Sequence, residues 1–309
     1  MNRPTHEGIL RLSHAAIRVP DLELAAAYYT EVVGLIETDR TPDQVYLKAW
    51  DEHQHHSIIL ESAPTYGLQY LGFKVSDRSE LDRLAKRVED ASTPITRHGP
   101  GELAIGSGDI VRFMAPSGHV IDLEYGQKQV GSALPLVNPP PAPQDLVGMH
   151  PPRIDHIFLM CEDVDGIHDF FTEVLEFRLT EQIKADDGHQ LAVFLERTHT
   201  AHDIAFVTGP NGAFHHVAFW VDEWGDLRDG ADMCAYHGVN LDVSPMRHGA
   251  TRGCGLYFFD PAGNRNELFT GGYRFDPDDK PTTWTEAEMG RAIFFYEGKV
   301  NTRWLEVHS

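Results

Sequence analysis

The chain has 309 residues, which is enough for two domains that each bury a core of their own. Its formal net charge of -21 at neutral pH would repel phosphate backbones and anionic membrane surfaces, so nucleic acid and membranes are poor candidate partners. No apolar stretch approaches the roughly 18 to 20 residues of a membrane span and no signal-peptide core is present, so we expect a cytoplasmic protein.

The first segment with a clear signature, residues 11–32, has a counterpart in residues 153–174. The former reads Arg-Leu-Ser-His and ends Tyr-Tyr-Thr-Glu-Val, and the latter reads Arg-Ile-Asp-His and ends Phe-Phe-Thr-Glu-Val. A second pair, residues 113–122 and 258–267, extends the similarity to the end of each half. The chain is therefore a duplicated module, and comparing its copies separates scaffold positions from site positions.

Three histidines of the first half, His53, His55 and His56, lie in the run Asp-Glu-His-Gln-His-His. The run has no strand or helix signature, so we predict a solvated polar turn rather than a metal site.

A proline-rich stretch separates the halves. Residues 137–143 and 150–152 hold prolines that can neither continue a helix nor pair within a central strand. We therefore divide the chain into an N-terminal domain (1–126), a linker (127–152), a C-terminal domain (153–272) and a tail (273–309).

The second half shows the order of its elements most clearly. A strand, a helix and three strands are expected, and the same order then repeats. The expected strands are 156–161, 178–184, 190–196, 204–207, 215–221, 239–243, 253–259 and 264–269, and the expected helices are 164–175 and 224–237. Each half thus reads as two paired βαβββ modules, which makes the fold class α+β with two tandem domains and a helical tail.

Three candidate metal ligands, His156, His216 and Glu267, fall on expected strands of the second half. The aligned positions of the first half are His14, Tyr70 and Asp122, so only the second half has two imidazoles and a glutamate. Two imidazoles and one carboxylate leave three positions of an octahedral ion open, the usual arrangement for non-haem Fe(II) oxygen chemistry. The same residue types could hold Zn(II), so the ligands alone do not select iron.

The residues around Glu267 are more specific. The run from His248 contains Tyr257, Asp260-Pro261 and Gly263 and ends at Glu267. This order resembles the signature of the type I extradiol ring-cleaving dioxygenases of the vicinal oxygen chelate (glyoxalase-like) superfamily. The similarity also covers the two-module layout, His202-Asp-Ile-Ala-Phe, His215-His216-Val and Lys280-Pro-Thr-Thr-Trp-Thr, and the nearest group is the catechol 2,3-dioxygenases.

The resemblance implies that Fe(II) is bound by His156, His216 and Glu267. It implies an acid–base role beside the iron for His202, and hydrogen bonds from His248 and Tyr257 to the substrate oxygens. The implied reaction is extradiol cleavage of catechol or an alkylcatechol by O2, giving a product of the 2-hydroxymuconic semialdehyde type. A homo-oligomer, usually a tetramer in this family, is also implied.

The pocket and the tail carry further expectations. The run Thr285-Glu-Ala-Glu is expected to form a capping box that opens a helix through Phe294, in a tail that covers the active site. We expect Ala250 to leave room for a ring substituent, and apolar pocket walls from Phe194, Phe294 and Phe295. The corresponding face of the first half is expected to be filled by side chains and to serve subunit contacts.

Alternation along a strand predicts that His215 points to the face opposite His216, as a packing or outer residue. Two other functions use the same modules. A glyoxalase-type isomerase would draw metal ligands from two cooperating modules, whereas here one copy holds a whole triad. A metal-free ligand-binding protein would have no need for His202, His248 and Tyr257 around that triad.

Overall fold

The first half of the chain forms one sheet with two α-helices. The computed structural model describes residues 7–309. The strands are β1 (Ile9–Val19), β2 (Ile36–Arg40), β3 (Gln44–Lys48), β4 (Ile58–Ser62), β5 (Gly67–Val75), β6 (Ile95–His98), β7 (Asp109–Met114) and β8 (Val120–Tyr125). Helix α1 (Leu22–Ala27) continues into a π-helical turn (Tyr28–Val33), and α2 is Arg78–Asp90.

The second half repeats this order. Its strands are β9 (Arg153–Cys161), β10 (Arg178–Lys184), β11 (Gln190–Glu196), β12 (Ile204–Thr208), β13 (Phe214–Trp220), β14 (Leu241–Arg247), β15 (Gly253–Phe259) and β16 (Arg265–Gly271). Helix α3 (Val164–Asp169) continues into a π-helical turn (Phe170–Val174), and α4 is Trp224–His237. The 3-10 turn Ala250–Arg252 precedes β15, and the tail holds β17 (Thr282–Thr285), the 3-10 turn Glu286–Glu288, α5 (Met289–Ile293) and α6 (Thr302–Glu306).

The sheet order confirms the α+β class with two tandem pairs of βαβββ modules. Within the described residues the first sheet runs β2-β3-β4-β1-β5-β8-β7-β6 and the second β14-β15-β16-β13-β9-β12-β11-β10-β17. In each sheet the two modules meet at their first strands, β1 with β5 and β9 with β13, which pair antiparallel. The tail supplies β17, which lies parallel to β10 at the edge.

The same aspartate cap begins the first helix of both halves. Asp21 accepts a hydrogen bond from the backbone N–H of Leu24 at 3.0 Å, and Asp163 accepts one from Gly166 at 2.8 Å. Such a cap satisfies a backbone donor that has no partner inside the helix. The duplication in the sequence is therefore also a duplication of local structure.

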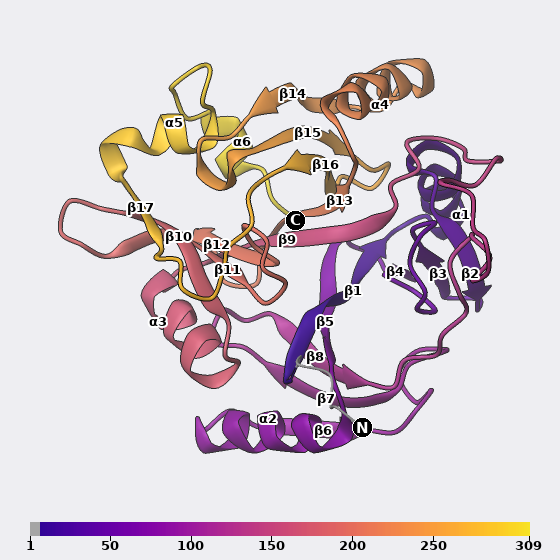
Figure 1. The fold of residues 1–309 in the computed structure, drawn as a ribbon, viewed down its shortest axis with the longest axis horizontal. Coiled ribbons are helices and arrows are strands. Elements are labelled where there is room, and N and C mark those ends of the chain that lie inside the picture. The colour runs from indigo at the N-terminus through magenta and orange to yellow at the C-terminus, as the bar shows by residue number, and fades with distance from the viewer. Residues whose placement is uncertain (1–6) are drawn as a thin grey trace.

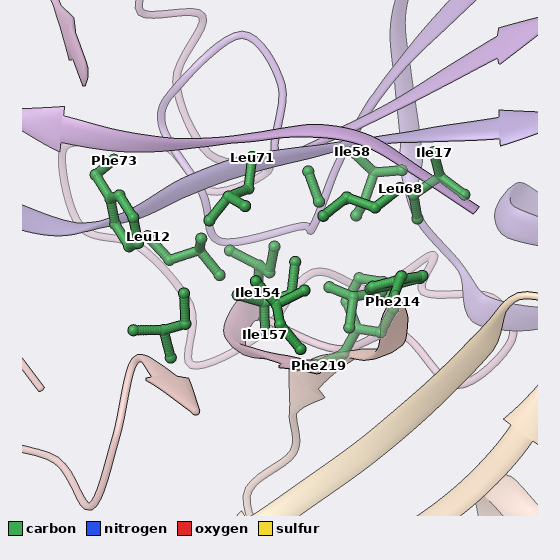
Figure 2. Close-up of a cluster of buried hydrophobic side chains, with 14 of the residues drawn as sticks. Leu12, Ile17, Ile58, Leu68, Leu71, Phe73, Ile154, Ile157, Phe214 and Phe219 are labelled. Carbon is green, nitrogen blue, oxygen red and sulfur yellow. The ribbon is translucent and has the colours of Figure 1, made fainter. Parts of the chain in front are cut away.

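The two halves share one hydrophobic core. Side chains of β1, β4 and β5 face side chains of β9 and β13, and the cluster contains Leu12, Leu71, Ile157 and Phe219 (Figure 2). Successive side chains of a strand point to opposite faces, so each sheet keeps its other face for contacts within its own half. In the second half that other face carries Phe158 in a separate cluster with residues of the tail. No helix within residues 7–309 is both long and apolar enough to cross a membrane.

The tail differs from its expected form. Thr285 stands at the helix start but makes no capping hydrogen bond through its side chain, and the segment begins as a 3-10 turn before α5. The predicted capping box is therefore wrong. Thr285 is the last residue of β17, whose register with β10 fixes its backbone. Figure 1 shows α5 and α6 beside the second sheet, with the C-terminus close to β13.

The predicted solvated turn at residues 53–56 holds for His53, which is exposed, but is wrong for His55 and His56. His55 and His56 are 1% and 0% exposed, and their Nδ1 atoms lie 3.0 Å apart. Strand registers explain why His56 is buried. Ala15 pairs with Ile58 just as Ile157 pairs with Ile204, so His56, two residues before Ile58, takes the position that His202 has in the second half.

Side chains fill the equivalent face of the first half, as predicted, and the role of this face in subunit contacts stays a prediction. Arg112 pairs with Asp122 across β7 and β8 in the way that Tyr257 pairs with Glu267 across β15 and β16. The Arg112 guanidinium donates two hydrogen bonds of 2.7 Å to the Asp122 carboxylate and lies 4.2 Å from the centre of the Tyr70 ring. A fixed side-chain cation thus neutralises the carboxylate that corresponds to Glu267.

Glu124, next to this face, gives a testable pH dependence. Burial raises its pKa to about 7 and lowers that of His14 to about 3, so between pH 3 and pH 7 their 3.5 Å contact joins two neutral groups and is not an ion pair. The pKa of Glu124 is higher in the folded than in the unfolded protein. The stability that protonated Glu124 contributes is therefore fully present below the unfolded value of 4.5 and is lost as pH rises through 7.

Glu124→Gln is therefore expected to raise the free energy of unfolding by up to about 3 kcal/mol at pH 8, with little change at pH 4. The amide oxygen can still accept the 2.8 Å hydrogen bond from the Gly108 N–H. Urea unfolding of both proteins across this pH range measures the difference. A variant less stable than the native protein at pH 8 would contradict the assignment.

Candidate metal centre

Three ligand groups converge from three adjacent strands of the second sheet. His156 lies on β9, His216 on β13 and Glu267 on β16. Glu267 Oε2 lies 3.1 Å from His156 Nε2 and 3.0 Å from His216 Nε2, and the two Nε2 atoms are 3.4 Å apart. All three side chains are buried, and they are the one His, Cys, Asp and Glu group of this geometry within residues 7–309.

The residues present fit a divalent metal. Two imidazole nitrogens and a carboxylate oxygen point at one another, and these atoms all lie within 4.8 Å of one another. The second carboxylate oxygen, Glu267 Oε1, is buried and has no hydrogen-bond partner. A buried acceptor without a partner requires an explanation, and an ion bound at this point supplies one. The donor set is that of the facial triad of non-haem iron enzymes.

The charges of the cluster agree with this reading. Burial alone would raise the pKa of Glu267, but hydrogen bonds from His156 and His216 outweigh it and hold the pKa well below its usual range. Burial alone would lower the pKa of His156, but Asp155 and Glu267 raise it to about 9, whereas burial lowers that of His216 to about 4. Without metal, the site thus holds its positive charge as a proton on His156.

His202 lies directly beside the triad. Its ring centre is 3.9 Å from that of His156, and the side chain is 4% exposed. Burial, and next the positive charge of His156, hold the pKa of His202 well below its usual value. The imidazole is therefore neutral, with one N–H and one lone pair available for proton transfer.

His248 and Tyr257 form a fixed pair on another side of the cavity. His248 Nδ1 lies 2.7 Å from the Ile293 carbonyl, which can only accept, so this nitrogen carries the proton. His248 Nε2 consequently has its lone pair free and accepts from the Tyr257 hydroxyl at 3.0 Å. Burial raises the pKa of Tyr257 well above its usual value, which keeps the phenol protonated as a donor.

His215 does not lie on the opposite face from His216. The ladder between β13 and β9 shifts by one residue between Phe214 and His216, which leaves His215 as an extra residue in β13. Such a bulge re-aims side chains. The Nδ1 atoms of His215 and His216 are 2.6 Å apart, so the prediction from strict alternation fails here.

The triad and its neighbours surround one small cavity, which has a volume of about 20 Å3 for water-sized molecules. Phe194 and Ala250 line it, but Phe294 and Phe295 do not. Helix α5 ends at Ile293, after which Phe294 packs against Trp304 with ring centres 5.5 Å apart, and Phe295 is 44% exposed. The lining contains no Arg or Lys and comprises His156, Phe158, Phe194, His202, His216, His248, Ala250, Thr251, Tyr257, Glu267, Phe269, Ala292, Ile293 and Trp304.

Glu181, which sequence reasoning missed, holds the loop after His248 in place. Its carboxylate accepts hydrogen bonds from the Thr251 N–H at 2.6 Å and from the Trp284 indole at 2.7 Å. Thr251 has a φ of 59°, a left-handed conformation that costs energy for a β-branched residue. One buried carboxylate thus fixes both the loop and the tail strand. A lone glutamate in a strand gives no sequence signal of such a role.

Comparisons with known proteins agree along the whole chain. The model of the Glyoxalase/Bleomycin resistance protein/Dioxygenase superfamily matches residues 153–268, and that of the Catechol 2,3-dioxygenase-like N-terminal domain matches residues 68–129. The metapyrocatechase of Pseudomonas sp. (strain CF600) is 41% identical over 97% of this chain and 99% of its own length. A manganese-dependent 2,3-dihydroxybiphenyl 1,2-dioxygenase of Geobacillus genomosp. 3 is 29% identical over 93% of this chain and 94% of its own length.

Solved structures give the same result. The 2,3-dioxygenase LapB from Pseudomonas sp. KL28 superposes with a TM-score of 0.88 at 38% identity, covering 91% of this chain and 99% of its own. Homoprotocatechuate 2,3-dioxygenase from Brevibacterium fuscum, in complex with 3,4-dihydroxyphenylacetate, superposes with a TM-score of 0.89 at 26% identity, covering 100% of this chain and 95% of its own.

Proposed function

Because this chain belongs to the extradiol dioxygenases of the vicinal oxygen chelate superfamily, we propose that it cleaves catechol or an alkylcatechol by O2 beside the two hydroxyls. One O2 would be consumed per ring, and both oxygen atoms would enter a product of the 2-hydroxymuconic semialdehyde type. The observation that carries the proposal is a complete His156, His216 and Glu267 triad with His202, His248 and Tyr257 around one cavity.

Fe(II) is the proposed metal, although one relative is named as manganese-dependent. A ferrous ion held by His156, His216 and Glu267 would bring the diol and O2 to adjacent positions and let electron density pass between them. Neutral imidazoles and an ionised carboxylate suit either metal. Metal analysis of anaerobically prepared protein, followed by activity after loading with Fe(II) or Mn(II), separates the two.

The side chains around the triad supply positioning and proton transfer. If the Tyr257 hydroxyl turns from His248 Nε2 to donate to a substrate oxygen, the released Nε2 lone pair of His248 can accept a hydrogen bond from a substrate hydroxyl. Together they favour a diol that has lost one proton. His202 is neutral and lies against His156. Its imidazole would accept a proton from the bound reactants and return that proton during ring cleavage.

The cavity favours an uncharged ring. Its walls are aromatic and small apolar side chains, and its lining contains neither Arg nor Lys to pair with a carboxylate on the substrate. A ring carrying an acid would lose its hydration without gaining an ionic partner. We therefore propose catechol and alkylcatechols as the substrates rather than carboxylated catechols.

The test is direct. Protein loaded anaerobically with Fe(II) receives catechol and then air, while oxygen uptake and formation of the yellow semialdehyde are recorded. One O2 consumed per yellow product supports the proposal. Bound iron without turnover of catechol, alkylcatechols or bicyclic diols would overturn the reaction and leave the metal site standing.

Ala250 gives a prediction about substituents. It is 2% exposed and lines the cavity, so a leucine at this position would fill space beside the ring. Ala250→Leu is expected to lower kcat/KM for 3-alkylcatechols at least about 10-fold more than for catechol, which serves as the internal control. If the variant and the native protein had the same kcat/KM for both substrates, the ring substituent would have to lie away from Ala250.

We also propose that the protein is a homo-oligomer, and by family resemblance a tetramer. Leu136 and Val137 in the segment between the sheets are 86% and 75% exposed, as expected where apolar side chains meet a second copy. Light scattering coupled to size exclusion measures the assembly directly against the chain mass of 34.7 kDa.

A further inference from the structure

The nitrogen of His216 that faces away from the triad contacts another histidine. His216 directs Nε2 at Glu267, and its Nδ1 lies 2.6 Å from Nδ1 of His215. The bulge in β13 makes this contact between consecutive residues possible. Both rings are buried, so neither nitrogen can turn to water instead.

Metal binding would fix the proton positions along this contact. A metal on His216 Nε2 requires the proton on Nδ1, and that proton must then be donated to His215 Nδ1. His215 must consequently carry its own proton on Nε2. That nitrogen lies 2.8 Å from the backbone carbonyl of Trp304, which can only accept.

Arg265 could donate to His215 Nε2 and so oppose the His215 tautomer with its proton on Nε2. Arg265 has other acceptors for its N–H groups. Its Nη1 lies 2.9 Å from His215 Nε2, and two N–H groups cannot donate to each other. The same Nη1 lies 2.8 Å from the Val307 carbonyl, and Arg265 Nε donates to Asp242 at 3.0 Å. If His215 Nε2 accepted from Arg265, the His215 proton would lie on Nδ1 and would be donated to His216 Nδ1. His216 would then carry its own proton on Nε2, and this nitrogen could not bind metal.

The Trp304 carbonyl, which accepts from His215 Nε2, belongs to the last segment of the chain. Trp304 lies on α6 and is 2% exposed, with its ring centre 4.3 Å from that of His215. Ser309 exchanges backbone hydrogen bonds of 2.7 and 2.9 Å with Phe214, two residues before His216. The docked tail therefore holds the acceptor in place, and Figure 1 shows the C-terminus close to β13.

We propose that His215 is a positioning residue that couples metal binding at His216 to docking of residues 301–309. The inference rests on the metal site of the proposed function. A docked tail selects the His215 tautomer that accepts from His216, and bound metal in turn strengthens tail docking, because coupling between two sites is reciprocal. The tail thus acts on the metal as well as covering the cavity.

The other imidazole ligand has a partner outside the tail. His156 Nδ1 lies 2.9 Å from the carboxylate of Asp155, its own preceding residue. A carboxylate accepts from His156 whatever the tail does. The tail therefore affects one of the two histidine ligands, which makes the coupling specific.

The test compares two substitutions of His215 in the full-length protein. Asn places its side-chain oxygen near the position of Nδ1 and keeps an acceptor for His216, whereas Phe keeps the ring shape and removes both polar contacts. Affinity for Mn(II), measured by competition with a chelator and without substrate, is expected to fall about 10- to 100-fold in His215→Phe and by much less in His215→Asn. Equal affinity in native and folded His215→Phe protein would overturn the inference.

A second measurement follows the tail itself. Backbone hydrogen exchange of residues 301–309 is expected to slow when Mn(II) binds to the native protein. His215→Asn should bind Mn(II) without that slowing, because its side chain no longer reaches the Trp304 carbonyl, and this holds as a test even if His215→Phe does not fold. Equal slowing in native and Asn proteins would overturn the coupling. Native protein that binds no divalent metal would instead overturn the proposed function.

Discussion

Replacing Glu267 with glutamine is expected to give a folded protein that retains little metal and has no measurable ring cleavage. Glu267 supplies the one negative charge of the triad, and both other ligands are neutral imidazoles when metal is bound. Without that charge, a dication would be buried beside an uncharged site, which is strongly unfavourable. The loss of affinity should exceed the roughly 10- to 100-fold that follows removal of an outer partner.

The measurement is metal content after anaerobic loading and desalting, together with oxygen uptake on catechol. Glu124→Gln is the matched control, since it is the same substitution at an equally buried glutamate of the first half. The control should keep both metal and activity. Glu267→Gln protein that retained stoichiometric metal and turned over catechol would show that the triad is misassigned.

Replacing His202 with phenylalanine is expected to separate metal binding from chemistry. His202 is not a member of the triad, so the metal should stay, and a phenyl ring fits among Phe194 and Phe269 of the lining. Removal of a positioned acid–base group typically lowers kcat by about 100- to 10,000-fold. Substrate affinity should change little, because His248 and Tyr257 still face the diol.

Three readouts test this separation: metal content, binding of catechol without oxygen, and kcat. His199→Asn is the control. His199 lies in the same loop but contacts the Phe275 carbonyl, and asparagine tolerates its φ of 60°. Metal-free His202→Phe protein would contradict the assigned role, since it would show that His202 holds the site together.

The sequence alone predicted the fold and the positions of the triad because both depend on regular local rules. Strand alternation gives a period of two, and the duplication supplies two copies in which scaffold positions recur. His156, His216 and Glu267 were distinguishable because Tyr70 and Asp122 replace two of them in the first half. The order of strands and helices confirmed the predicted fold.

Alignment of the two halves also indicates that His56 is buried, whereas the polar composition around it suggests the opposite. His56-Ser-Ile-Ile-Leu60 aligns with His202-Asp-Ile-Ala-Phe206, and the strand registers place His56 where His202 lies in the other half. The polar composition of the run before His56 instead favours a solvated turn. His55 and His56 are buried inside the first half, where His56 contacts both His55 and His14.

Tertiary structure alone decided the contacts that join distant segments. A bulge in β13 turned His215 toward His216, and docking of the tail placed the Trp304 carbonyl at the far nitrogen of His215. Packing against Trp304 also drew Phe294 out of the cavity lining. Such contacts have no period and no local motif. They exist only after both sheets have formed and the last nine residues have docked, so no window of sequence could show them.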